Sequence, residues 1–107
     1  MIYELRVDEI VPGKAPQAHE RLEKHLMGFF AKHGITVVGI WTDEIGTSNQ
    51  LKALLAFDDL ADRERKWSEL QSDQAWIEIR TKSEEDGPLL ACVTNTILRP
   101  TSYSPAQ

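Results

Sequence analysis

The sequence predicts a single α+β domain, in which one face of a four-stranded antiparallel sheet is covered by helices. The chain has 107 residues, enough for one hydrophobic core and too few for two domains. Apolar residues recur with a period of two in four segments and with spacings of three and four in the segments between. These periods are typical of strands and helices, respectively. The resulting βαββαβ order, with the second helix split in two, is that of the ferredoxin-like fold.

The first strand is expected at residues 2–10, because apolar and charged side chains alternate there. Pro12 and Gly13 then break the pattern. The alternation puts Tyr3, Leu5 and Val7 on one face of the strand and Glu4, Arg6 and Asp8 on the other. Charge pairs among the second set would lie inside a barrel formed by two sheets or at the seam of a dimer.

A helix is expected from about Ala15 to His33. Pro16 suits its first turn, where a missing N–H costs nothing, and Gly34 suits the position after its end. Five residues form one apolar stripe at helical spacing: Ala18, Leu22, Leu26, Phe29 and Phe30.

Two further strands are expected at about residues 35–44 and 50–57, joined by a short loop that contains Gly46 and Asn49. This spacing is typical of a hairpin. Both segments carry apolar residues on both of their faces. Helices on one side of the sheet would therefore leave a second apolar face uncovered.

The remaining elements are a second helical region from about residue 58, a third helix that Asp73 would cap, and a last strand at about residues 90–98. Gly87 and Pro88 separate the last two. Residues 1–100 are thus interpreted as the domain and 101–107 as a C-terminal tail. Because the second sheet face is apolar, we expect a homodimer in which two sheets close on each other as a dimeric α/β barrel.

Composition excludes several kinds of partner. The net charge is −5 and the basic residues are scattered, which argues against nucleic acid and against an anionic membrane surface. No apolar run approaches the about 18 residues that a membrane-spanning helix needs. The chain opens on a strand pattern and carries a single cysteine, Cys92, which is expected to be buried and inert. Together these features predict a cytoplasmic protein.

Several segments together resemble the NIPSNAP family of the dimeric α/β-barrel superfamily. They are MIYELRVDEIVPGK, FFAKHGITVVGIWTDEIG, SNQLKALLAFDDLADRERKW, DQAW and TNTILRPTSYSP. The resemblance implies a ferredoxin-like protomer and a homodimer. It implies no settled reaction and no catalytic residues, since the biochemical role of the family is poorly defined. Related barrels place ligands between sheet and helices.

His25 is the candidate for chemistry. A wheel of 100° per residue places it in the apolar stripe of the first helix, where its ring needs a polar partner. It would either be hydrogen-bonded in the core or act as an acid/base group in a pocket. No cofactor is expected. No metal site is expected either, because the three histidines lack the spacing of a helical zinc site.

A ligand pocket is expected to be lined by Tyr3, Phe29, Trp41, Trp67 and Asn95. Large aromatic residues usually fill a core, so packing alone is the competing interpretation. Asn95 interrupts a strand pattern, and its amide would contact either a ligand or a neighbouring backbone group.

Three functional hypotheses follow. The favoured one is a dimeric NIPSNAP-like protein that binds a small apolar ligand or a protein partner. The alternative is a cofactor-independent monooxygenase or isomerase for an aromatic or polyketide-like substrate, with His25 as acid/base. The third is a purely structural assembly.

Overall fold

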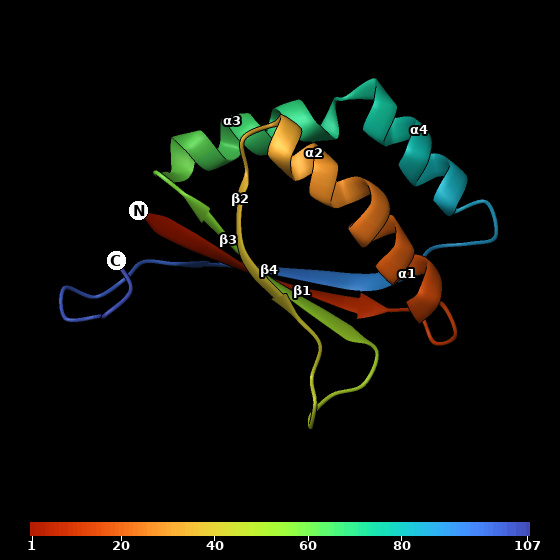
Figure 1. The fold of residues 1–107 in the computed structure, drawn as a ribbon, viewed down its shortest axis with the longest axis horizontal. Helices are drawn as coiled ribbons and strands as arrows, with labels where there is room; N and C mark the ends of the chain where they lie inside the picture. Colours follow the sequence, from red (N-terminus) through yellow and green to blue (C-terminus); the bar gives the residue numbers. More distant parts are fainter.

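Four strands form one antiparallel sheet with the order β2-β3-β1-β4 in the computed structural model, which describes residues 1–107 (Figure 1). The strands are β1 (Ile2–Ile10), β2 (Thr36–Trp41), β3 (Gln50–Phe57) and β4 (Leu90–Leu98). β1 lies at the centre and pairs with both β3 and β4. The predicted α+β, ferredoxin-like protomer is confirmed.

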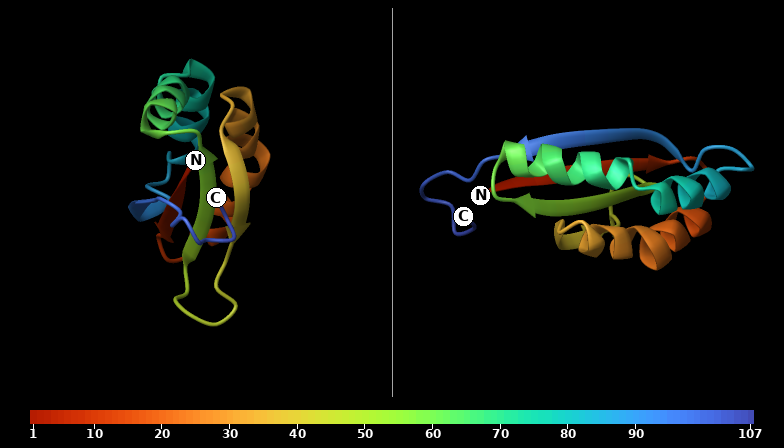
Figure 2. Two further views of the ribbon diagram at one scale, coloured as in Figure 1. Left: turned by 90° about the vertical axis from the view of Figure 1, so that its left-hand side faces the viewer. Right: turned by 90° about the horizontal axis from the view of Figure 1, so that it is seen from above.

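The helices lie on one face of the sheet, in two rows that run side by side (Figures 1 and 2). One row is α1 (Ala15–Arg21), a π-helical turn η1 (Leu22–Leu26) and α2 (Met27–Lys32). The other row is α3 (Leu60–Gln71) and α4 (Gln74–Ser83). None of these helices is long and apolar enough to cross a membrane.

Local signals in the sequence explain where the helices start and stop. Asp59 caps α3 by accepting a hydrogen bond from the amide of Asp62, and Asp73 caps α4 through the amide of Ala75. Gly34 ends the first row with a φ of 73°, a conformation that favours glycine.

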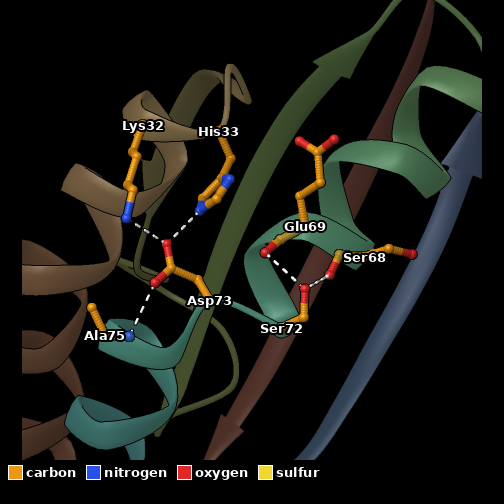
Figure 3. Close-up of polar contacts among 7 residues, drawn as sticks. All are labelled: Lys32, His33, Ser68, Glu69, Ser72, Asp73 and Ala75. Carbon is orange, nitrogen blue, oxygen red and sulfur yellow. Dashed lines mark hydrogen bonds and ion pairs between the residues drawn. The ribbon is translucent and has the colours of Figure 1, made fainter.

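Asp73 also joins the two rows of helices (Figure 3). Its carboxylate oxygen Oδ2 lies 2.7 Å from Lys32 Nζ and 2.7 Å from His33 Nε2, at the end of the first row. These bonds lower the pKa of Asp73 to about 2, with Lys32 as the largest cause and His33 as the next.

The hydrophobic core lies between the helices and the sheet. The register places Ile2, Glu4, Arg6, Asp8 and Ile10 of β1 on the face toward the helices, because successive strand residues point to opposite faces. The largest buried cluster comprises Ile2, Phe30, Ile35, Leu55, Phe57, Trp67, Leu70 and Trp76.

The opposite face of the sheet has no helix over it (Figure 2). We call it the open face. By register it carries the apolar side chains Tyr3, Leu5, Val7, Trp41, Leu54 and Leu98. The C-terminal segment reaches one end of it, where the Tyr3 hydroxyl donates to the carbonyl of Gln107 at 2.9 Å.

Two details differ from the sequence-based expectation. β2 ends at Trp41, so the turn to β3 is longer than predicted. Cys92, expected to be buried, is exposed, because it lies on the edge strand β4 opposite Glu9 and points away from the helices.

Candidate functional site

A cavity of about 150 Å³ lies between the helices and the sheet. Its apolar wall comes from both rows of helices and from the strands, through Ala18, Leu22, Leu26, Leu51, Leu70 and Leu90, with Trp67 and Trp76 beside them. Two of the leucines belong to η1, where the widened turn places them in the wall. π-helical turns are frequent at functional sites because they change the direction of side chains within a helix.

Charged side chains enter this apolar cavity in pairs. On β1, Arg6 Nε donates to Asp8 Oδ1 at 2.8 Å. Between α1 and the end of α4, Arg21 Nη1 donates to Glu84 Oε1 at 2.9 Å and to Ser83 Oγ at 3.2 Å. The guanidinium of Arg21 also lies 5.9 Å from the ring centroid of Trp76.

A third arginine, Arg80, lines the cavity from α4, where its Nη1 donates to Gln71 Oε1 at 3.2 Å. The cavity wall thus holds three arginines against two carboxylates, Asp8 and Glu84. One positive charge remains uncompensated at this site, in a protein whose overall net charge is −5.

The cavity adjoins an open cleft between α3 and β4. Arg6, Trp67 and Gln71 line both spaces, and Arg63 and Asn95 line the cleft alone. β4 is an edge strand whose outer part no helix covers, so this side of the molecule gives the cavity a connection to solvent.

Glu4 forms the floor beneath this cleft and is fully buried. Arg63 binds both oxygens of its carboxylate, at 3.0 and 3.1 Å. Trp67 Nε1 donates to it at 2.9 Å and Asn95 Nδ2 at 2.6 Å. Burial raises the pKa of Glu4, but the bonds from Arg63, Trp67 and Asn95 outweigh burial and lower it below its usual value. Glu4 is therefore held ionised.

The comparisons with known proteins agree with this architecture. Residues 3–105 match the NIPSNAP family model. The chain belongs to the NIPSNAP family. No functionally curated protein matches the chain.

Solved structures of other NIPSNAP proteins have the same fold. A NIPSNAP family protein with unknown function from Agrobacterium tumefaciens is 27% identical, with a TM-score of 0.86 over 100% of this chain and 94% of that one. An uncharacterized NIPSNAP-like domain protein from Burkholderia xenovorans is 30% identical, with a TM-score of 0.84 over 97% and 88% of the chains. Another A. tumefaciens NIPSNAP protein, 24% identical over 99% and 98% of the chains, supports the fold alone, with a TM-score of 0.87.

His25 of this NIPSNAP protein is exposed and does not line the cavity. It lines an open groove between the first row of helices and α4, together with Ile79 and Lys82. The sequence-based wheel placed His25 in the apolar stripe because it assumed a regular α-helix. His25 lies inside η1 and is exposed, whereas Leu22 and Leu26 of the same π-helical turn line the cavity.

The five expected pocket residues are not brought together. Trp67 lines the cavity, and Asn95 lines the adjoining cleft, where its amide binds Glu4 instead of a ligand or the backbone. By register Tyr3 and Trp41 lie on the open face, although Trp41, at the end of the edge strand β2, also borders a groove with Leu22 and Met27 of the first row. Phe29 packs on Trp76, with the ring centroids 5.7 Å apart.

Two arginines of the cavity, Arg21 and Arg80, were missed by sequence reasoning. Arg21 lies outside the apolar stripe predicted for the helix, yet its side chain is only 11% exposed. Arg80 carried no signal in the sequence. Arg6 did have one, since it alternates with apolar residues on a strand in the centre of the sheet. No group of three or more His, Cys, Asp or Glu side chains is arranged to hold a metal ion.

Proposed function

We propose that this NIPSNAP protein binds a small, mostly apolar molecule in the cavity between helices and sheet. The observation that carries the proposal is the cavity itself, which combines eight aliphatic and aromatic side chains with six polar ones. This combination is typical of small-molecule sites. Its volume of about 150 Å³ equals that of engineered cavities that take up a benzene-sized ligand.

The experiment fills the cavity. Ala18 is buried in the wall, so Ala18→Leu adds side-chain volume where a ligand would lie. Ala31→Leu adds the same volume on the exposed side of α2 and serves as the matched control. Benzyl alcohol, a neutral molecule of suitable size, is the probe. It should raise the Tm of the wild type and of Ala31→Leu with increasing concentration, and leave that of Ala18→Leu unchanged.

Two results would contradict the proposal: no shift of the wild-type Tm, or equal shifts in both variants. Native mass spectrometry of the purified protein gives an independent measurement. A co-purified molecule in the wild type that is missing from Ala18→Leu would support the same cavity.

We also propose that two copies pair across the open face. Its support is the set of apolar side chains there, which includes Trp41 with 51% of its surface exposed. Contiguous apolar patches of this kind are typical of interfaces. A different protein partner is the competing occupant, and the cytoplasmic location expected from the sequence stays a prediction.

The catalytic alternative has weaker support. A monooxygenase or isomerase that used His25 would need this side chain beside the bound substrate, and His25 lines only the open outer groove. Replacement of His25 by Ala is expected to leave ligand binding in the cavity unchanged.

A further inference from the structure

We infer that the ligand of this cavity is a small monocarboxylic acid, whose carboxylate is bound by Arg6 and whose apolar body fills the space behind it. The inference rests on the proposed function and names the chemical class of its ligand.

Among the three cavity arginines, Arg6 alone also lines the adjoining cleft, and it has unused hydrogen-bond donors. Only its Nε is occupied, by Asp8, and its two terminal nitrogens make no hydrogen bond within the protein. Every fully buried polar side-chain atom of the protein has a partner, so the free nitrogens of Arg6 keep access to solvent. Their position, where the cavity meets the cleft, is where a ligand would present its charged group.

Trp67 holds the guanidinium of Arg6 in this place. The guanidinium carbon lies 5.4 Å from the centroid of the Trp67 ring, and Trp67 is itself fixed by its bond to Glu4. Asp8 constrains the other edge of Arg6. The side chain is only 17% exposed and is therefore oriented before a ligand arrives.

Two of the other arginines around the site, Arg63 and Arg21, have their charges balanced by carboxylates. Arg63 is bound by Glu4 and Glu64, and Arg21 by Glu84. Arg80 donates to the neutral side chain of Gln71 at the cavity rim. The lining as a whole keeps a single uncompensated positive charge, that of Arg80, so its net charge matches one carboxylate and not a phosphate monoester or a dicarboxylic acid.

The remainder of the ligand follows from the wall. Most of the wall beyond Arg6 is aliphatic and aromatic, with Leu22, Leu51 and Leu70 among its residues; its other polar side chains are Asp8, Arg21, Gln71, Arg80 and Glu84. A ligand body that packs on the apolar part of the wall would find no hydrogen-bond partners there, which favours an apolar body. The volume of about 150 Å³ limits the body to roughly the size of a benzene ring.

The test compares benzoate with benzyl alcohol, which has a similar body and no charge, by isothermal titration calorimetry at neutral pH. We expect the wild type to bind benzoate about tenfold more tightly or better, because a hydrogen-bonded charged group is worth at least that factor. Arg6→Met should abolish the preference and leave the affinity for benzyl alcohol unchanged. Arg99→Met alters the net charge equally at an exposed site and should keep the preference.

A second variant is included because Arg6→Met would leave the Asp8 carboxylate without its partner, and this could prevent the protein from folding. Arg6→Met/Asp8→Asn removes both members of the ion pair, so the net charge of the cavity lining stays the same. The guanidinium nitrogens that would bind the carboxylate of the ligand are lost. Circular dichroism checks its fold. It should bind benzyl alcohol and no longer prefer benzoate.

The outcomes separate the two proposals. If benzyl alcohol binds as tightly as benzoate, or if the Arg6 variants keep the preference, the carboxylate inference is overturned and the cavity proposal stands. If neither molecule binds the wild type, the proposed function is overturned, and the inference falls with it.

Discussion

Glu4 has no exposed surface, and three side chains from two elements bind its carboxylate. We expect Glu4→Gln to lower the free energy of unfolding by about 3 kcal/mol, because it removes the fully buried charge that pairs with Arg63 and leaves this partly buried guanidinium with only the exposed Glu64 as counter-ion. Chemical denaturation measures this loss. Glu9→Gln removes a charge from the same strand at an exposed position and should change stability by less than about 0.5 kcal/mol. Equal losses in both variants would contradict the role given to Glu4.

Asp73 gives a pH-dependent prediction. Its pKa in the folded protein is about 2, below the ordinary value of 3.8, so the ionised carboxylate stabilises the fold. This contribution is fully present above the ordinary pKa and is lost as the pH falls from about 4 towards 2. Asp73→Asn keeps a good helix cap but loses the charge that Lys32 and His33 bind.

We therefore expect Asp73→Asn to lower the Tm by a few degrees at pH 7, and the difference from the wild type to shrink as the solution is acidified to pH 2.5. Thermal melts followed by circular dichroism measure both effects. Asp59→Asn is the matched control, because the Asp59 side chain caps α3 without binding a cation. A Tm difference for Asp73→Asn that is constant across this pH range would contradict the prediction.

At the scale of single residues, helix caps could be predicted from the sequence, but long-range contacts between side chains could not. Asp73 was predicted as a cap from its place between two helical patterns, since capping is a local interaction. Glu4 and Asn95 are 91 residues apart, and no pattern in the sequence indicated that they meet. The partner of a charged side chain depends on tertiary register, which local reasoning does not determine.

Among the elements, the first row of helices contains two glycines with opposite requirements. Gly34 ends α2 with a φ of 73°, whereas Gly28 lies inside α2 with open space where a Cβ would be. Gly34→Ala should destabilise the protein by about 1 kcal/mol because of strain, and Gly28→Ala should stabilise it by roughly 0.5–1 kcal/mol because alanine is the better helix former. Urea denaturation of both variants measures the two signs, and equal signs would contradict this account.

The strands were predicted more accurately than the long helix. Alternation and turn residues gave β1, β3 and β4 with the observed ends, at 2–10, 50–57 and 90–98. The region Ala15–His33 was predicted as one regular helix, and η1 was missed because a π turn has no residue signature comparable to a glycine or proline. His25, which lies in η1, is exposed instead of facing the expected pocket.

For the whole molecule, the open face leads to a prediction about association. Leu5 lies near its centre on β1, and Leu5→Glu should convert a dimer into a monomer, because it places a charge between two apolar surfaces. Leu60 is 50% exposed at the start of α3, on the helical side, and Leu60→Glu should leave the dimer intact. Sedimentation velocity at micromolar concentration distinguishes the species. A monomeric wild type would contradict the pairing.

The family and the protomer fold followed from the sequence because strand order, turn residues and characteristic segments are all encoded locally. The cavity did not, because its wall is assembled from both helical rows and the sheet, and its volume depends on how their side chains meet. The expected pocket of Tyr3 and Trp41 mixed residues from two sides of the sheet for the same reason.

The position of Glu4 has a consequence for biosynthesis. On a ribosome, β1 emerges first and β4 last, yet the carboxylate of β1 needs Arg63, Trp67 and Asn95, of which Asn95 is in β4. Until that last strand has left the exit tunnel, the Glu4 carboxylate of the nascent chain lacks one of its three hydrogen-bond partners. Stalled or truncated chains that end before β4 should therefore be sensitive to proteases and depend on chaperones.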